Sequence, residues 1–304
     1  MKKEITNIAA SVRKRLYDRA KQTNRPFDEL LQYYAMERFL YRLSISTHRD
    51  KFVLKGALMF VVWKAPRARA TKDMDFLAKT KNSIDNLVEV VREVCVIAVE
   101  PDGVLFDPKT VIGERIKENA EYEGVRVRFK GQLEQARVSM QIDVGFGDTV
   151  TPAPAVVDYP VILEFPAPRL KGYPPETVVA EKFEAMVKLG EVNTRMKDFY
   201  DLWLLREQFS FEGPVLAEAL KTTFSNRETE LSVDPVAFSE SFATDRQRQT
   251  QWSAFLRKTK LSHAPEQFKD VIGLIMPFLR PVLLAVISSK RWDRHWKASG
   301  PWSL

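Results

Sequence analysis

The sequence has little cysteine and no long uninterrupted apolar segment, and both shortages limit what the protein can be. Cys95 is the single cysteine among 304 residues. An internal disulfide framework is therefore excluded, and a reducing compartment such as the cytoplasm is favoured. Cys95 lies in an apolar run, which predicts a buried and unreactive thiol. The amino-terminal segment is charged throughout and has no apolar core of signal-peptide length.

The most apolar stretch, residues 271–288, does not have the pattern of a membrane span. Pro277, Arg280 and Pro281 interrupt it. A span needs about 20 mostly apolar residues without such breaks. We therefore expect a pair of buried helices here, no association with a membrane, and a cytoplasmic protein.

The composition is that of a soluble globular protein with a basic excess. Hydrophobic residues make up 45% of the chain and charged residues 29%, which are ordinary values. Lysine and arginine number 47 against 40 aspartate and glutamate residues, which gives a formal net charge of +7. This excess favours a polyanionic partner, although a modest excess is also compatible with a role in solubility alone.

Periodicity predicts an α/β chain in two parts. Apolar residues at helical spacing predict helices over 4–21, 27–43 and 82–98. Alternating or β-branched runs predict strands over 104–106, 110–116, 122–130, 136–146 and 156–165. Four prolines fall between residues 166 and 175, and we place a domain boundary there that divides 1–170 from 171–304. The second part is predicted helical over 175–190, 197–209, 213–224, 234–258 and after 266, with a mobile basic tail from residue 290.

The stretch over residues 52–78 organises the first part. It is predicted to form a strand, a turn at Gly56, a short helix and a second strand that carries Asp73 and Asp75. Because successive side chains on a strand point to opposite faces, these two carboxylates share one face. They repel each other unless a cation lies between them, and a divalent ion with oxygen ligands is the usual solution. Backbone N–H groups after Gly56 are suited to a phosphate. Nucleotide chemistry is the resulting hypothesis.

Asp143 is a third acidic candidate. It lies on the polar face of the alternating strand 136–146, whereas Asp148 belongs to the opposite face and is left out of the site. A lone aspartate is more often a solvated or strand-end carboxylate. The pair Asp73 and Asp75, followed by Asp143 on a later strand, favours a shared site instead.

Four segments carry a recognisable pattern in a fixed order. They are Lys55-Gly56 followed by Trp63, then Arg69-x-Thr71-x-Asp73-x-Asp75-Phe76, then Glu181-Lys182, and finally the run from Arg195 to Leu202. With these segments, which cover roughly residues 50–205, the sequence resembles the AbiEii/AbiGii (MenT-like) family of nucleotidyltransferase toxins. That family belongs to the DNA polymerase beta-like superfamily. Single short motifs are weak, but four in the right order are fairly specific.

The resemblance implies a fold and an activity. The fold would be α/β, with a nucleotidyltransferase-type mixed β-sheet core, N-terminal helices and a helical C-terminal domain. The protein would be a Mg²⁺-dependent toxin of a toxin–antitoxin or abortive-infection system. It would transfer NMP from NTP to the 3′ end of tRNA and so block translation. Two alternatives stay open: nucleotidyl transfer to a protein side chain, and a non-catalytic toxin that binds GTP.

The resemblance also assigns roles to residues. Asp73 and Asp75 would hold Mg²⁺, and Asp143 would bind a second metal ion or accept the proton of the attacking hydroxyl. Lys182 would contact the triphosphate as a point charge. Asp198 matches a family position tied to activity. The residues assigned to nucleotide binding are Lys55, Gly56, Ala57 and Lys182.

Some of these positions have a simpler interpretation. Ala57 stands where family members generally carry Gly or Ser, so a hydroxyl for the β- or γ-phosphate is missing. Lys182 is also compatible with an exposed surface pair, and Asp198 with a carboxylate near a helix start. Asp201 is expected to pack or to cap its helix. Arg69 is expected to orient the strand that carries the aspartates.

The resemblance suggests tRNA or another RNA as acceptor, and an antitoxin with a DNA-binding domain that makes no stable contact. Two basic clusters are candidates for RNA binding, although a solvated basic face is an equally good interpretation of either. The first is Arg126, Arg128 and Lys130 on one strand face. The second is the tail, with Lys290, Arg291, Arg294 and Lys297 beside Trp292 and Trp296.

Overall fold

The computed structural model describes residues 7–119, 122–290 and 292–304. Within it the chain divides into two compact units. The first contains the described residues up to 64 together with 70–147 and 155–172. The second contains residues 65–69, 148–154 and 173–304. Two short segments that precede residue 170 in sequence, 65–69 and 148–154, therefore belong with the helical second unit.

The first unit is built on a seven-stranded mixed sheet with strand order β3-β4-β5-β2-β1-β7-β6. The pairs β2–β5 and β1–β7 are parallel and the others are antiparallel. The strands are β1 (Phe52–Lys55), β2 (Asp73–Ala78), β3 (Val104–Asn119), β4 (Tyr122–Leu133), β5 (Ala136–Phe146), β6 (Ala155–Asp158) and β7 (Arg169–Gly172). The helices are α1 (Ile8–Thr23), α2 (Phe27–Ile45), α3 (Leu58–Val62) and α4 (Ile84–Cys95), with a 3-10 turn at Arg49–Lys51.

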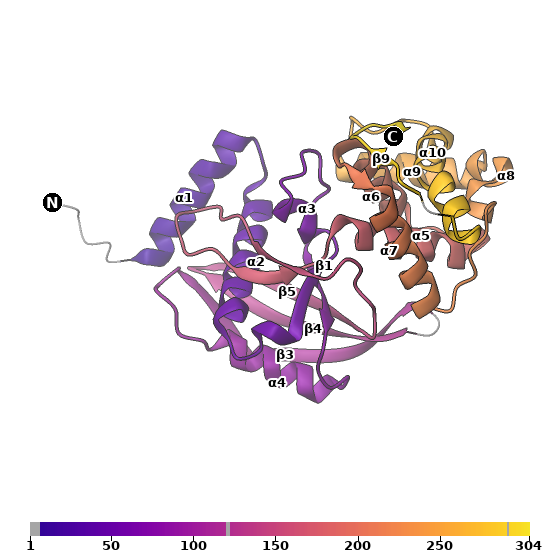
Figure 1. The fold of residues 1–304 in the computed structure, drawn as a ribbon. Helices are drawn as coiled ribbons and strands as arrows, with labels where there is room; N and C mark the ends of the chain where they lie inside the picture. Colours follow the sequence, from indigo (N-terminus) through magenta and orange to yellow (C-terminus); the bar gives the residue numbers. More distant parts are fainter. Residues whose placement is uncertain (1–6, 120–121, 291) are drawn as a thin grey trace. The chain divides into compact units, whose positions relative to one another are not determined.

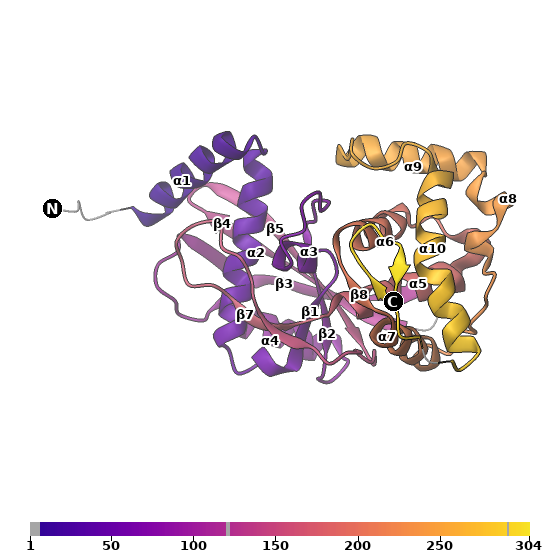
Figure 2. The ribbon, with the colours of Figure 1, turned by 45° about the horizontal axis from the view of Figure 1, so that its top comes forward.

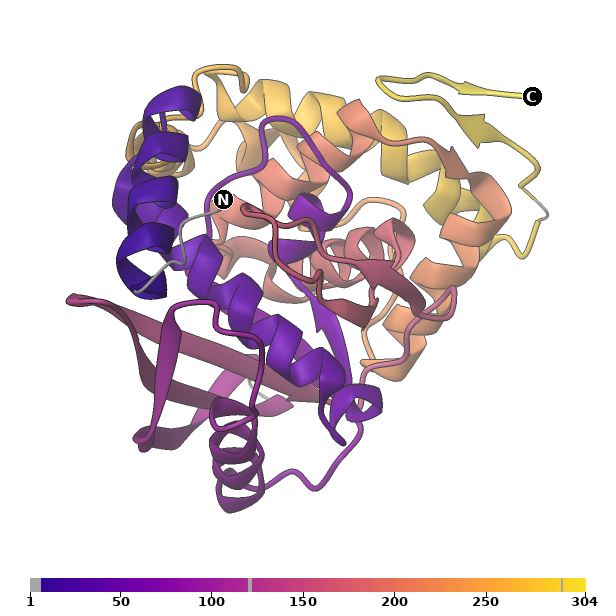
Figure 3. The ribbon, with the colours of Figure 1, turned by 90° about the vertical axis from the view of Figure 1, so that its left-hand side faces the viewer.

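Helices α2 and α4 cover one face of this sheet (Figures 1 and 3). Phe39 of α2 and Leu87 of α4 line its apolar core together with Phe76 of β2 and Ile142 of β5. Residues that alternate with these apolar side chains along β2 and β5 point to the opposite face. The register of the sheet therefore decides which polar side chains meet on that face.

Local signals set the helix ends in this unit. The Asn7 side chain accepts a hydrogen bond from Ala10 N at the start of α1, and the Ser83 hydroxyl accepts one from Asn86 N at the start of α4. Helix α1 ends at Asn24, which is left-handed with a φ of 52°. Of the helix predicted over 4–21, residues 4–6 lie outside the described residues.

The second unit is mainly helical (Figure 2). Its helices are α5 (Pro175–Leu189), α6 (Met196–Gln208), α7 (Gly213–Asn226), α8 (Glu240–Ala243), α9 (Arg246–Thr259) and α10 (Phe268–Ile287). Short 3-10 turns lie at Gly190–Val192 and Val236–Phe238. A three-stranded antiparallel sheet joins β8 (Phe211–Glu212), β9 (His295–Trp296) and β10 (Trp302–Ser303).

Several predicted segments differ from the structure. The strand expected over 156–165 is shorter, since β6 ends at Asp158. The helix expected over 234–258 is broken, because Ser239 caps α8 by accepting from Phe242 N and Asp245 caps α9 by accepting from Arg248 N. The strands expected over 104–106 and 110–116 are one strand, β3, with a register shift between Asp107 and Ile112. In the helical segment, polar residues end one helix and begin the next. In β3, the segment between Asp107 and Ile112 shifts the register of the strand without ending it.

Helix α10 is one continuous helix where a pair was expected. Gly273, Pro277 and Pro281 are spaced four residues apart on its less buried side. Each proline lacks the N–H that would bond to the carbonyl four residues earlier. Because these carbonyls lie toward solvent, water can satisfy them and the helix continues.

Within the described ranges, α10 is the one helix long and apolar enough to cross a membrane by length and composition, and 44% of its most apolar window is buried inside the protein. Its buried side packs on α6, α7 and α9. This packing favours the predicted role as a core helix.

The tail beyond residue 291 is packed, not mobile as expected. Trp296 is 2% exposed, and its indole N–H donates to the Arg206 carbonyl at 2.9 Å. The Trp302 indole N–H donates to the Phe278 carbonyl of α10 at 2.9 Å. Indole groups with satisfied N–H donors are good anchors for a chain end. Arg291 lies outside the described residues.

Substitutions to alanine on the two sides of α10 should differ in their effect on the free energy of unfolding. Phe278 is 0% exposed and Leu284 is 48% exposed. We expect Phe278→Ala to lower the free energy of unfolding by roughly 3–5 kcal/mol, and Leu284→Ala to change it by less than about 0.5 kcal/mol. Urea unfolding followed by tryptophan fluorescence measures both values. Equal effects of the two substitutions would contradict the assignment of α10 to the core of the second unit.

Candidate active site

One row of charged residues crosses the sheet of the first unit. Lys55 of β1 is opposite Asp75 of β2, and Asp75 is opposite Asp143 of β5. Asp143 in turn is opposite Arg126 of β4. Register partners point to the same face, and neighbouring strands lie about 4.8 Å apart. The row therefore places two carboxylates side by side and a cation on each outer side of them.

Asp73 lies on the same face as this row, two residues before Asp75. Its carboxylate and that of Asp75 are half-buried, whereas Asp143 is 9% exposed and Lys55 is 6% exposed. The charged face is thus built into the sheet and is not an accidental gathering of surface side chains. The sequence predicted that Asp73 and Asp75 share one strand face and that Asp143 lies on the polar face of a later strand, and both match this placement.

Gly56 makes close contact with the Asp75 carboxylate. A Cβ atom at Gly56 would lie 2.0 Å from Asp75 Oδ2, and the residue has a φ of 71°. Only glycine combines this left-handed conformation with so close an approach. The turn leads through the buried Ala57 into the short helix α3. Ala57 brings no hydroxyl, so the backbone N–H groups of the turn are its polar donors.

The carboxylate of Asp143 is held by Arg126. The guanidinium donates from Nε to Asp143 Oδ1 and from Nη2 to Oδ2, both at 2.7 Å. Paired donors of this kind form strong, oriented contacts. The pKa of Arg126 is raised, first by its hydrogen bond to Asp143 and further by the charges of Asp143, Asp73 and Glu114. Arg126 is therefore electrostatically part of the acidic site.

The acidic face fits a magnesium ion that arrives with its nucleotide. Within residues 7–119, 122–290 and 292–304, no three Asp, Glu, His or Cys side chains are grouped so as to hold a metal ion by themselves. Mg²⁺ usually keeps several waters and binds through one or two carboxylates plus substrate phosphates. Asp73 and Asp75, next to the Gly56 turn, offer that kind of donor set. Asp143 is occupied by Arg126.

Lys182 and Asp198, the other two predicted site residues, form a buried network in the second unit. Lys182 Nζ on α5 lies 2.7 Å from Asp198 Oδ1 and 2.8 Å from Asp201 Oδ2 on α6. Arg69 donates to both oxygens of Asp201 at 3.0 Å, and Arg195 Nε lies 2.7 Å from Asp198 Oδ2. Each carboxylate is thus shared between Lys182 and one arginine.

Burial and charge act against each other in this network. Burial alone raises the pKa of Asp198, but the charges of Lys182 and Arg195 outweigh it and lower this pKa to about 2. Burial alone lowers the pKa of Lys182, but the charges of Asp198 and Asp201 outweigh it and raise this pKa above its ordinary value. Both groups are therefore ionised near neutral pH, and Lys182 is a fixed ammonium ion.

Sequence reasoning missed two members of this network. Asp201 was expected to pack or cap, and Arg69 to orient the strand of aspartates. Instead the Asp201 side chain is 1% exposed and accepts from both Arg69 and Lys182. The spacing of Asp198 and Asp201, three residues apart on one helix face, was the available signal. Asp148, left out of the site, pairs with Arg227 at 2.9 Å.

Several residues of the two basic clusters predicted to bind RNA make contacts within the protein instead. Arg126 pairs with Asp143, and Arg128 Nη1 lies 2.8 Å from Glu114 Oε1. In the tail, Trp296 is buried and cannot stack on a base. The expected pairing of tail cations with Trp296 on an RNA surface is therefore wrong for this tryptophan.

Paired aspartates beside a glycine turn suit a metal ion and a phosphate, which is the donor set that nucleotidyl transfer needs. The family model of the nucleotidyl transferase AbiEii toxin, type IV toxin–antitoxin system, matches residues 38–273, well over half of the chain. The chain therefore belongs to the AbiEii family of nucleotidyltransferase toxins. The resemblance recognised from the sequence motifs is confirmed. The comparison with curated proteins gives no match.

The comparison with solved structures gives matches to two structures from Helicobacter pylori. JHP933 shares 15% sequence identity at a TM-score of 0.50, over 86% of this chain and 95% of JHP933. A structure described as that of a candidate nucleotidyltransferase shares 14% identity at a TM-score of 0.49, over 86% of this chain and 98% of the other. At such identity JHP933 shows the fold alone, and the predicted mixed α/β fold class is confirmed.

The contact of Gly56 with Asp75 can be tested against a second left-handed glycine. Gly56→Ala should abolish the growth inhibition that the toxin causes on expression, because its Cβ would displace the Asp75 carboxylate. Gly147 has a φ of 81° and nothing within 4 Å of its Cβ position, so Gly147→Ala is the matched control. Both variants carry backbone strain of about 1–2 kcal/mol. Only the first should lose toxicity, at equal soluble expression. Loss of toxicity in both would show that strain alone is responsible.

The buried network should make stability depend on pH in acid. The folded-state pKa of Asp198 is lowered to about 2, below an unfolded value of about 3.9. Its contribution is therefore present above pH 4 and is lost as the pH falls toward 2. Asp198→Asn should lower the free energy of unfolding at pH 7 by about 2 kcal/mol, and this difference from the native protein should shrink between pH 4 and 3.

Urea unfolding at a series of pH values measures this difference. Asp85→Asn, at an exposed position on α4, is the control and should stay close to the native protein throughout. A difference for Asp198→Asn that stays constant down to pH 3 would contradict the assigned ionisation of Asp198.

Proposed function

We propose that the protein transfers NMP from an NTP to RNA, most specifically to the 3′ end of a tRNA, and thereby blocks translation in the cytoplasm. Membership of the AbiEii family gives the class of activity. The observation that carries the proposal is the row in which Asp75 and Asp143 lie between Lys55 and Arg126. A basic chain with a formal net charge of +7 is suited to a polyanionic acceptor.

Asp73 and Asp75 are proposed to hold Mg²⁺ together with the phosphates of the NTP. When bound, the ion neutralises charge on the triphosphate and orients it. The Gly56 turn would contribute backbone N–H groups to a phosphate, and Lys55 a buried positive charge at the edge of the row. Because Ala57 brings no hydroxyl, phosphate contacts at this turn would depend on backbone N–H groups and cations.

The residues of the second unit are proposed to act through charge. Lys182 is paired with two carboxylates and stays protonated, so it would act on the triphosphate as a cation and not as a base. Asp198 would fix the position of the ammonium group. Asp201 and Arg69 complete the support of Lys182 from its other side.

In the proposed reaction the 3′ hydroxyl oxygen of the RNA forms a bond to the α-phosphorus, and the bond from that phosphorus to the pyrophosphate oxygen breaks. The hydroxyl proton must leave during this step. Asp143 is the candidate acceptor, provided that one of its oxygens is released by Arg126. A role for Asp143 as a ligand to a second metal ion would require the same release.

The cognate antitoxin, with a DNA-binding domain, is proposed to make no stable contact.

The proposed function predicts where a label from NTP goes. Purified protein incubated with α-labelled NTP, Mg²⁺, total RNA and total protein should label the RNA fraction, and sequencing of RNA 3′ ends should identify the acceptor. Asp75→Asn should reduce labelling at least 100-fold, because one oxygen ligand and one negative charge are lost from the site. Asp85→Asn, on the surface of the same unit, should leave the rate unchanged.

Other outcomes would contradict the proposal in distinct ways. Label in the protein fraction would assign the activity to a protein side chain. Tight binding of GTP without release of pyrophosphate, with toxicity retained by Asp75→Asn, would assign a non-catalytic role.

A further inference from the structure

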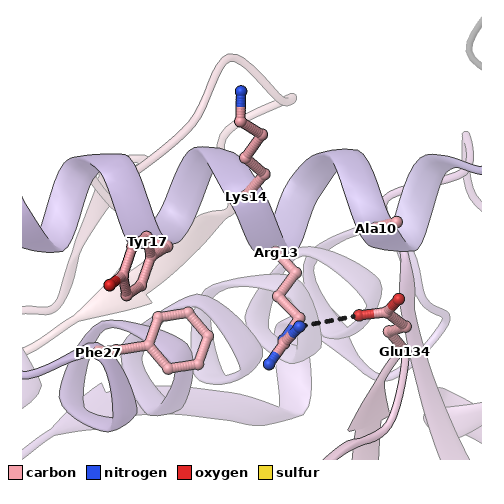
Figure 4. A pocket seen from close by; sticks show the side chains of 6 residues that line it. All are labelled: Ala10, Arg13, Lys14, Tyr17, Phe27 and Glu134. Carbon is pink, nitrogen blue, oxygen red and sulfur yellow. Dashed lines mark hydrogen bonds and ion pairs between the residues drawn. The ribbon is translucent and has the colours of Figure 1, made fainter.

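A groove lies between α1 and the turn that joins β4 and β5, within the first unit. Its volume is about 440 Å³, and it is lined by Ala10, Arg13, Lys14, Tyr17, Phe27 and Glu134. Figure 4 shows Tyr17 and Phe27 side by side, with Arg13 between Phe27 and Glu134 and Lys14 on the other side of the helix. A space of this volume accommodates a nucleotide-sized group.

The groove combines exposed aromatic rings with cations. Tyr17 is 49% exposed, and its ring centroid lies 6.1 Å from that of Phe27 in an edge-to-face arrangement. The Arg13 guanidinium lies 6.0 Å from the Phe27 centroid, and Lys21 Nζ lies 4.5 Å from the Tyr17 centroid. Aromatic faces next to cations are the groups on which nucleobases and phosphates bind without sequence preference.

Helix α1 carries an excess of positive charge on its residues outside the buried side. Val12, Leu16 and Ala20 are its buried residues, and α1 packs on α2. The other positions of the helix carry five cations against a single acid, Asp18; the cations are Arg13, Lys14, Arg15, Arg19 and Lys21. A solvated face can carry such charges, but the adjoining aromatic groove is not required for solubility. The combination favours a polyanion with planar groups.

Strand β5 runs from the turn beside this groove to the acidic row. Along β5 the exposed side chains Arg137 and Ser139 alternate with buried ones and precede Gln141 and Asp143 on the same face. Seven residues from Asp143 back to Ala136 span about 23 Å at roughly 3.3 Å per residue. That is the length of about seven stacked nucleotides at roughly 3.4 Å each. An RNA that ends at the acidic row can therefore reach the turn at Glu134.

We propose that this groove, formed by α1 and the β4–β5 turn, binds the acceptor RNA about seven nucleotides from the end that is modified. The α1 cations contact phosphates, and the Tyr17 ring stacks on a base or covers a ribose. The inference rests on the proposed function. Glu134 is the one acidic residue in the lining, and its carboxylate lies 3.3 Å from Arg13 Nη1. It competes with a phosphate for the Arg13 guanidinium.

Fluorescence anisotropy with two labelled RNAs tests the proposal. One RNA is a hairpin with a stem of about ten base pairs and a single-stranded 3′ end, and the other is a single strand of four nucleotides that cannot reach the groove. Tyr17→Ala should weaken binding of the hairpin about tenfold. Arg13→Gln should weaken it and reduce the slope of log K against log salt by about one. Neither variant should change binding of the short RNA.

One further test variant and one control variant complete this experiment. Glu134→Gln should strengthen binding of the hairpin, because Arg13 is released and a negative charge is removed. Arg92→Gln changes an exposed cation on α4 and should have no effect on either RNA. Circular dichroism and urea unfolding confirm that each variant is folded before binding is measured.

The result that overturns the inference is hairpin binding that Tyr17→Ala, Arg13→Gln and Glu134→Gln all leave unchanged. If such variants also label the short RNA at the native rate, the proposed function survives and only this inference fails. If the native protein binds neither RNA and transfers label to protein, the proposed function fails and the inference fails with it. A preference for the hairpin that depends on these three residues supports both.

Discussion

The arrangement of the charged sheet face depends on the placement of two carboxylates, Asp75 and Asp143, next to each other on neighbouring parallel strands. Their mutual repulsion is compensated by Lys55 on one side and Arg126 on the other, through the register of four strands. A slip of one residue in any of these strands would turn a charge into the apolar core. The apolar residues Phe76 and Ile142, which pack under α2 and α4, therefore fix the polar site as firmly as its own ion pairs do.

In the helical unit the two aspartates of the network are buried and each is paired with more than one cation. Lys182, Arg69 and Arg195 surround Asp198 and Asp201, which are almost fully buried. Desolvating such groups is costly, so each must be paired from more than one side. Arg69 is only four residues before Asp73 in sequence. The same short stretch of chain thus supplies a carboxylate to the acidic face and a cation that supports Lys182, which explains why the motif extends from Arg69 to Asp75.

Much of the sheet could be predicted from the sequence, because alternation is a local signal. The shared face of Asp73 and Asp75 follows from the period of two, and the glycine turn from a residue type that tolerates a positive φ. The pairing of β2 with β5 then brings Asp143 to the same face. The partner of Asp143 could not be predicted, since Arg126 is brought to it by strand pairing seventeen residues away. Nor could the continuity of α10, because whether a proline breaks a helix depends on which side faces water. The packed tail likewise depends on long-range contacts of Trp296 and Trp302.

Asp143 and Asp198 both have arginine partners, and they illustrate how environment separates similar groups. Asp198 is itself buried and is shared by Lys182 and Arg195, so its charge is held from two sides. Asp143 has Arg126 as its guanidinium partner at the edge of a face where Asp73 and Asp75 are half-buried. A guanidinium that is itself 28% exposed at its side chain can exchange a carboxylate for a phosphate with little desolvation. Asp143 therefore has one guanidinium partner on an open sheet face, whereas Asp198 is held by both a lysine and an arginine.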